Sequence, residues 1–374
     1  MNQKSSGSAS LLSIQVIIVA LLAWGIFALM FFLLFSVPLP GQARPGWYSV
    51  TTYVLEGTAF LVAALLCFRN YGSSQIVSGR SVWLLIGSGM LSFFIGNLIL
   101  GQWEIGWGKE PDVSPADVFY LLMYVLVGTG MVMAVTSRKL NLSFLQVLIV
   151  FGIGIVGAAF AWFVYNGAGD EAAFRFEAPA IAQTAPVEAP APPTAPPTAP
   201  PTAVSPDAAP IIAPAPLEAP SIVAPAVTSP PVVPASPVVP ASPAASPSGE
   251  AAAETAADVP AWALALEELF APLGDSLAIA YVAGDIVLLM SATMLLLAFW
   301  GGRFSVSWRF IAAAAICFYV ADMWFLYATR FVSDYQTGGL LEVFWIFSAC
   351  LFGIGAALEY DLSSRSRRSS RRRS

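Results

Sequence analysis

The sequence has no histidine, only three lysines and three cysteines, and only 11% charged residues in a chain of 374. Without an imidazole there is no histidine ligand for haem or (bacterio)chlorophyll, and no His-containing zinc or copper site. Lys4, Lys109 and Lys139 all lie outside the apolar runs, which excludes a retinal Schiff base in the bilayer. The cysteines offer neither a disulfide framework nor a metal-binding pattern. We therefore expect no cofactor and no metal ion.

Apolar residues, by contrast, are abundant: 57% of the chain is hydrophobic, and the mean hydropathy is +0.73. A soluble domain carries roughly 25% charged residues, so this composition excludes a soluble enzyme. The sequence has no Walker loop, no nucleophile elbow and no pair of soluble carboxylates. It predicts a polytopic membrane protein that is not an enzyme.

Eight apolar stretches are long enough to cross a bilayer, whose core of about 30 Å needs about 20 apolar residues per helix. None of them contains a proline, and the first is interpreted as a retained signal anchor. They cover residues 11–36, 48–69, 82–102, 117–136, 143–165, 277–300, 308–328 and 339–359. The predicted fold class is an all-α membrane protein with eight transmembrane helices.

The segment between the fifth and sixth spans differs in composition, because residues 168–258 contain 22 of the 29 prolines. Proline removes a backbone donor and fixes φ, so this segment is expected to be a disordered linker with polyproline II character. After it, Trp262 and Leu269 belong to a short pattern typical of an amphipathic helix on the membrane surface. The expected organisation is a cytoplasmic N-terminus (1–10), a first membrane unit with helix five (11–167), the linker (168–258), the interfacial helix (259–272), a second membrane unit (273–360) and an Arg/Ser-rich cytoplasmic tail (361–374).

The basic residues predict the orientation. The side that holds both termini receives 13 of the 17 lysines and arginines, and the other side receives Arg44, Lys109, Arg175 and Arg330. Basic residues concentrate on the cytoplasmic side, so we expect a bacterial inner-membrane protein with cytoplasmic termini and an external linker. Six arginines in the tail are expected to bind anionic lipid headgroups. Nucleic acid is not an expected partner.

The two halves of the chain resemble each other, which predicts two parallel four-helix repeats with the linker inserted into the second. At an offset of 228 residues, Glu56 falls one position from Asp285. Parallel repeats with unbroken helices weaken, without removing, the interpretation as a secondary transporter. The pairs at an offset of 225 residues include Trp83/Trp308, Phe93/Phe318, Asn97/Asp322, Asp117/Glu342 and Gly130/Gly355.

Polar residues inside the spans are the candidate ligand-binding residues, because acids within a membrane are costly and by default suggest a function. With the predicted orientation they all fall toward the outer ends of their helices. Together they could line an acidic cup that opens outward and holds a cation, an amine or a shared proton. The six residues are Glu56, Asn97, Asp117, Asp285, Asp322 and Glu342.

Each of these residues also has a structural interpretation. Ser114-Pro115-Ala116-Asp117 has the pattern of a helix start, so capping is favoured over ligand contact for Asp117, and Glu342 is ambiguous in the same way. Asp285 and Asp322 fit a site and an interhelical hydrogen bond equally well. For Glu56 a ligand-binding role is slightly favoured, whereas for Asn97 a hydrogen bond between helices is favoured.

The segment Asp112-Val-Ser-Pro-Ala-Asp-Val-Phe-Tyr-Leu-Leu-Met-Tyr124 resembles a motif of bacterial multi-helix membrane sensor regions, which precede GGDEF and EAL domains or histidine kinases. Ala280-Tyr-Val-Ala-Gly-Asp-Ile-Val-Leu-Leu289 is similar to a second motif of that group, although Val282 stands where proline is usual. Ala321-Asp322, followed by Tyr335-x-x-Gly338 and Phe344-Trp345, resembles the ending of that group. The resemblance implies a signal-input membrane domain whose polar positions map to Asp117, Asp285 and Asp322. Residues 360–374 contain no output domain of this kind, so we expect an input module that acts on a separate partner or a reused scaffold.

Three functions fit these observations. The leading hypothesis is a sensor-type module that binds a ligand, cation or proton in the acidic cup and signals through a separate membrane or cytoplasmic protein. The second is an accessory or scaffold subunit of a larger membrane complex. The third is a transporter that couples to protons or cations through the same acids.

Overall fold

The computed structural model describes residues 13–37, 44–109, 113–136, 143–166, 259–299, 305–332 and 335–371, with side chains as far as residue 365. The expected linker (168–258), the N-terminal segment (1–10) and the side chains of most tail arginines lie outside the described residues. All described helices belong to one compact unit, which combines Met1–Ala173 with Pro247–Ser374.

Within the described residues, eight helices are long and apolar enough to cross a membrane, as the sequence predicts, and no strand is present. Proline-free runs of leucine, isoleucine, alanine and phenylalanine form them, because these residues bury well and do not interrupt the helical hydrogen bonds. The elements are α1 (Ile14–Phe35), α2 (Gly46–Gly72), α3 (Arg80–Gly101) with a π-helical turn (Gln102–Gly106), α4 (Ala116–Thr136), α5 (Phe144–Asn166), α7 (Ala261–Phe270), α8 (Gly274–Ala298), α9 (Ser305–Phe331) and α10 (Val343–Arg371).

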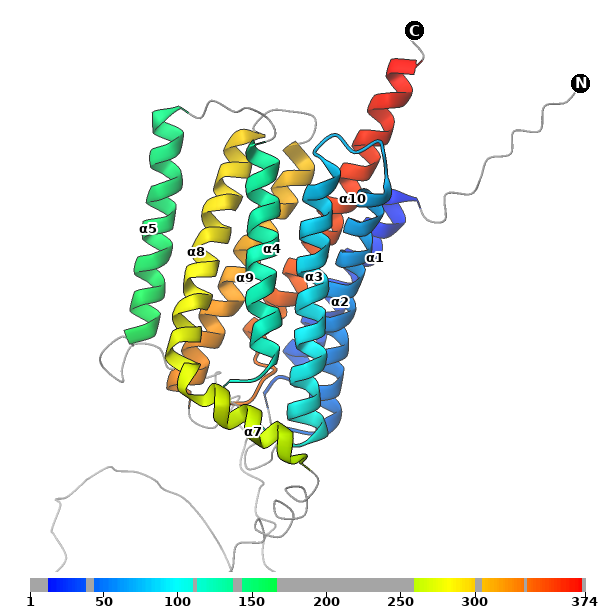
Figure 1. Ribbon diagram of the computed structural model, residues 1–374. Coiled ribbons are helices and arrows are strands. Elements are labelled where there is room, and N and C mark those ends of the chain that lie inside the picture. Colours follow the sequence, from blue (N-terminus) through cyan, green and yellow to red (C-terminus); the bar gives the residue numbers. More distant parts are fainter. Residues whose placement is uncertain are drawn as a thin grey trace, which may run out of the picture. The chain divides into compact units, whose positions relative to one another are not determined.

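Six helices form a closed ring. The order around it is α2, α3, α4, α8, α9 and α10, and α10 returns to contact α2. Outside the ring, α1 packs mainly on α10, and α5 packs on α8 and α9 (Figure 1). Neighbouring spans alternate in direction, so that α2, α4, α8 and α10 begin at the end of the bundle where α3 and α9 finish (Figure 1).

Aromatic side chains from α3 and α9 fill the centre of the ring. Trp83 and Trp308 are both fully buried, with ring centroids 5.7 Å apart. Farther along the same two helices, Phe93 meets Phe318 edge to face at 5.5 Å. Large apolar side chains therefore join the two halves of the chain through the middle of the bundle.

The structure adds detail at two places, the short helix after the Pro-rich segment and the end of the last span. The short helix expected over 259–272 is α7, and it is tied to the π-helical turn region by a hydrogen bond from Trp103 Nε1 to Glu267 at 3.1 Å and by a 2.7 Å ion pair between Lys109 and Glu267. Helix α10 continues to Arg371 instead of ending near residue 359. The extension contains neither glycine nor proline, and Asp361 pairs with Arg365 one turn later at 2.9 Å, a spacing that supports a helix.

Candidate functional site

All six residues singled out from the sequence lie in one half of the bundle, where α2, α4, α8 and α10 begin and α3 and α9 end (Figure 1). We call it the acidic half. Glu56, Asn97, Asp285 and Glu342 are buried, whereas Asp117 and Asp322 are partly buried. That these residues form an outward-open cup stays a prediction.

Tyr124 of α4 brings together Asp285 of α8 and Asp322 of α9. Its hydroxyl lies 3.0 Å from Oδ1 of Asp285 and also contacts Oδ2 of Asp322. The indole Nε1 of Trp345, in α10, donates to Oδ1 of Asp322 at 2.5 Å. These four side chains come from four helices of the ring, and we call them the paired-acid network.

The paired-acid network has more acceptors than donors. Ionised carboxylates only accept, whereas a phenol and an indole supply one hydrogen each. The indole hydrogen goes to Asp322, so the single phenol hydrogen can satisfy only one of the two carboxyl groups that it touches. In addition, Oδ2 of Asp285 is buried without a hydrogen-bond partner in the described part of the chain. The geometry therefore fits one extra proton held among Asp285, Tyr124 and Asp322, as in other carboxyl pairs that share a proton.

Glu342 ends a short 3-10 helical turn (Leu340–Glu342) that leads directly into α10, and it has a different environment. Its carboxylate accepts hydrogen bonds from the backbone N–H groups of Gly338 and Gly339, each at 2.7 Å, and from the Tyr335 hydroxyl. Gly338 has a φ of +107°, which favours glycine, and a Cβ at this position would clash with the ring of Tyr48. Glu342 thus caps the start of its own helix and closes the loop 335–339. We call this arrangement the Glu342 clasp.

Arg44 and Tyr48 hold the same loop from the α2 side. The Arg44 guanidinium donates to the carbonyl oxygen atoms of Gln336 at 2.6 Å and Thr337 at 2.8 Å, and the Tyr48 hydroxyl donates to that of Gly338 at 2.7 Å. In the loop, burial and the nearby Glu342 charge raise the pKa of Tyr335, so its hydroxyl keeps its proton and donates. Three donors point at the Glu342 carboxylate, so its structural role accounts for an acid at this buried position.

Asp117 in the first turn of α4 also has a capping role. Its Oδ2 accepts from the backbone N–H of Ser114 at 2.8 Å, while Oγ of Ser114 accepts from the N–H of Ala116 at 3.2 Å. This is the capping arrangement that the Ser-Pro-Ala-Asp pattern predicts. Its Oδ1 accepts from the Tyr281 hydroxyl at 2.6 Å, and the Tyr281 ring packs edge to face against Tyr124 at 5.9 Å. Asp117 therefore joins the helix end to the paired-acid network.

Glu56 of α2 lies beside Asn97 of α3. The side-chain amide of Asn97 faces the Glu56 carboxyl group, and the Tyr53 hydroxyl faces that of Glu104. In the described part of the chain, no group of three or more histidine, cysteine, aspartate or glutamate side chains is arranged to hold a metal ion.

Sequence reasoning missed the aromatic partners of the acids, Tyr124, Tyr281, Tyr335 and Trp345. The sequence does contain a hint of these contacts, because the hydroxyl of a buried tyrosine and the indole N–H of a buried tryptophan usually need a hydrogen-bond partner. Tyr124 even ends the motif that resembles sensor regions. A single sequence does not say which acid each hydroxyl reaches, since the partners are 23 to 198 residues apart where they lie on different helices.

Comparisons with known proteins assign the chain to no family. No family model, no curated protein and no solved structure matches it. The functional inference therefore depends on the chemistry of the acidic half.

Proposed function

We propose that this chain is a non-enzymatic, multi-pass membrane protein of sensor type, which responds to the protonation of the paired-acid network and signals through a separate protein partner. The observation that carries the proposal is the Tyr124 hydroxyl in contact with both Asp285 and Asp322. A sensor needs two packings that differ in affinity for its signal. Because each member of the network belongs to a different helix, a gain or loss of one proton changes the contacts among four helices at once.

The depth of the network supports a functional interpretation. Asp285 lies 11 residues after Gly274, the first residue of α8, which corresponds to about 16 Å along the helix at 1.5 Å per residue. That distance is about half of a bilayer core of about 30 Å, where acids are costly and usually functional. Asp117 and Tyr281 lie between the network and the end of the bundle, which gives protons a polar route to it from the acidic half.

The proposed duplication gives the network a counterpart in the other half of the chain. It is supported by the ring, in which α2, α3 and α4 are followed by α8, α9 and α10 in the same order. Gly130 packs against Ile86 and Val82 of α3, and Gly355 packs against Ile311 and Ser307 of α9. Every residue of the second contact lies 225 positions after its counterpart in the first. On this proposal, Asn97 of the first repeat occupies the position of Asp322 in the second.

We place the protein in a bacterial inner membrane, with cytoplasmic termini and the acidic half toward the outside. The distribution of the basic residues in the sequence supports this orientation. The Pro-rich segment 168–258 would then belong to the external side, and external pH would reach the paired-acid network through the acidic half. The motifs shared with bacterial sensor regions support the same interpretation.

The proposal is tested with the full-length protein in lipid nanodiscs, by following tryptophan fluorescence and backbone hydrogen exchange from pH 5 to pH 8. The wild type is expected to show a pH-dependent transition in α4, α8, α9 and α10. Asp285→Asn and Asp322→Asn should each abolish it, because asparagine cannot exchange the proton. Asp275→Asn, an exposed acid in the first turn of α8, is the matched control and should leave the transition unchanged.

Each remaining outcome contradicts the proposal. A protein without a pH-dependent transition, or with one that persists in Asp285→Asn and Asp322→Asn, is not a proton sensor of this design. Proton or cation flux into proteoliposomes that stops in the same two variants would instead establish a transporter. Constant stoichiometric co-purification with one large complex, independent of pH, would establish a scaffold subunit.

A further inference from the structure

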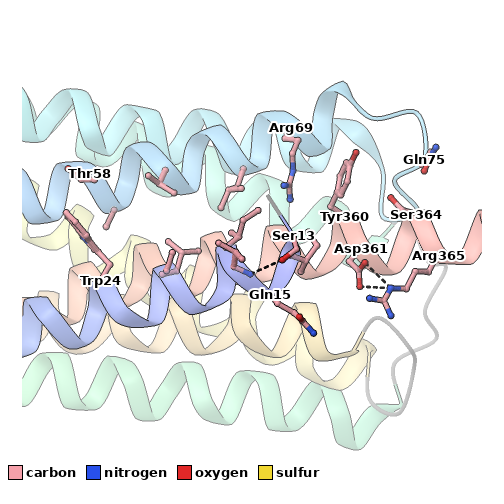
Figure 2. A pocket seen from close by; sticks show the side chains of 18 residues that line it. Ser13, Gln15, Trp24, Thr58, Arg69, Gln75, Tyr360, Asp361, Ser364 and Arg365 are labelled. Atoms are coloured by element: carbon pink, nitrogen blue, oxygen red, sulfur yellow. Dashed lines mark hydrogen bonds and ion pairs between the residues drawn. The ribbon is translucent and has the colours of Figure 1, made fainter. Parts of the chain in front are cut away.

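A lateral groove lies between α1, α2 and the later turns of α10, in the half of the bundle opposite the acids (Figure 2). Its volume is about 1120 Å³, more than the roughly 300–1,000 Å³ of typical small-molecule pockets. Because α1 packs mainly on α10 and only lightly on α2, the groove is open along the side of the bundle. In a membrane, this side faces lipid.

The groove is polar at one end and apolar along its length. Arg69, Tyr360 and the Asp361–Arg365 pair gather at the polar end, while Trp24 and Thr58 lie toward the other end (Figure 2). Between them the lining is apolar and includes Leu21, Val62 and Leu66. This distribution matches a molecule with a polar head and a hydrocarbon chain.

Arg69, at the polar end, forms no ion pair within the described part of the chain. Its guanidinium lies over the ring of Tyr360, with Cζ 4.3 Å from the ring centroid. Two of its nitrogen atoms, Nε and Nη2, are buried and have no acceptor among the described residues. Guanidinium nitrogen atoms that are buried without an acceptor are costly, whereas phosphate oxygen atoms match the fork of donors.

The charge of the lining fits a single phosphate. Its charged residues are Arg69, Arg365 and Asp361, which gives a net charge of +1. Asp361 is engaged by Arg365 at 2.9 Å, so it does not neutralise Arg69. A phosphodiester carries one negative charge.

The length of the groove fits one leaflet. On α2 the lining runs from Thr58 to Arg69, which is about 16 Å along the helix at 1.5 Å per residue. A bilayer core is about 30 Å thick, so each leaflet contributes about half of that. Arg69 falls in the last turn of α2, at the depth where a lipid headgroup begins.

We propose that this groove binds one anionic glycerophospholipid from the leaflet at this end of the bundle. Its phosphate accepts hydrogen bonds from Arg69, and an acyl chain lies along Leu21, Val62 and Leu66. This site is separate from the paired-acid network and from the tail arginines, and it stands whether or not the protein senses protons.

The test is native mass spectrometry of the full-length protein, purified in mild detergent and exposed to equal amounts of phosphatidylglycerol and phosphatidylcholine. The wild type should retain one phosphatidylglycerol in preference to phosphatidylcholine. Arg69→Gln should lower the affinity for it about fivefold, which is equivalent to about 1 kcal/mol for one basic residue at an anionic surface. Added inorganic phosphate should not displace the lipid, because the acyl chain contributes to binding.

Arg80→Gln is the matched control. Arg80 lies at the same end of the bundle and donates to the carbonyl oxygen of Tyr71 at 2.6 Å, but it does not line the groove, so this variant should retain the lipid. Ala20→Trp is a second test, since Ala20 is exposed and lines the groove, and the larger side chain should exclude an acyl chain. Thermal unfolding verifies that each variant is folded.

Three results would overturn the proposal. The first is equal retention of phosphatidylglycerol by Arg69→Gln and Arg80→Gln. The second is equal retention of phosphatidylglycerol and phosphatidylcholine by the wild type. The third is lipid binding that appears only after residues 1–12 are removed, since the groove would then hold part of this chain instead of a lipid.

Discussion

The Glu342 clasp and the paired-acid network place buried acids in the same half of the bundle, but their hydrogen bonding differs. Glu342 receives hydrogen bonds from two backbone N–H groups and from Tyr335. Asp285 and Asp322 share one phenol hydrogen, and Oδ2 of Asp285 has no partner among the described residues. A buried acid with enough donors stabilises a charge and a loop. A pair with too few donors fits a shared proton, and this is the arrangement that we propose changes state.

The largest loss of stability is expected for a substitution of Glu342, because its carboxylate accepts from three donors. Glu342→Ala leaves the N–H groups of Gly338 and Gly339 and the Tyr335 hydroxyl without their acceptor. Each unsatisfied buried donor costs about 1–3 kcal/mol, so the loss of an acceptor for three donors should lower the free energy of unfolding by at least about 3 kcal/mol. Denaturation of the protein in detergent measures it, with the exposed Glu268→Ala as control. A loss below about 1 kcal/mol would show that the clasp does not hold the loop.

Removal of the Tyr124 hydroxyl, which contacts both acids of the paired-acid network, should cause a smaller loss of stability. Tyr124→Phe removes one hydroxyl and keeps the ring, so the free energy of unfolding should fall by about 1–2 kcal/mol. The same measurement on Tyr281→Phe should give a smaller loss, because Asp117 keeps its hydrogen bond from Ser114. A larger loss in Tyr281→Phe than in Tyr124→Phe would contradict the central place given to Tyr124.

The cap of α4 should contribute about as much as an ordinary helix cap. Ser114→Ala removes the Oγ that accepts from Ala116, and a lost N-cap costs about 1 kcal/mol. Thermal unfolding should show this loss, while the pH-dependent transition of the wild type should be kept. Loss of the transition would mean that the helix start belongs to the sensing element.

The smallest loss of stability is expected for the Lys109–Glu267 ion pair, because water reaches both charges. Lys109 and Glu267 pair at 2.7 Å with side chains 31% and 21% exposed, and such pairs contribute about 0.2–1 kcal/mol. Lys109→Met should therefore destabilise the fold only slightly, and high salt should reduce the difference from the wild type. If Lys109→Met lowered the free energy of unfolding as much as Glu342→Ala, buried and solvent-accessible acids would contribute equally to stability, which contradicts this account.

The fold was largely predictable from the sequence, whereas the site was predictable only in part. Spans of about 20 proline-free apolar residues indicate helices directly, and the pattern around Ser114 and Asp117 indicates a cap. The grouping of six polar residues in one half follows from the alternating direction of the helices. The assignment of Tyr124 to Asp285 and Asp322 did not follow, because it depends on how α4, α8 and α9 are rotated about their axes. The capping role of Glu342 stayed open as well, since its donors come from the loop before it.

Infrared difference spectroscopy tests most directly whether the paired-acid network holds a proton. It detects the carbonyl stretch of a protonated carboxyl group, which an ionised carboxylate lacks. At neutral pH, the difference between the wild type and the double variant Asp285→Asn, Asp322→Asn should contain a carboxylic-acid band that shifts in deuterium oxide. Spectra of the two proteins that coincide in this region would show that both aspartates are ionised, and would contradict the shared proton.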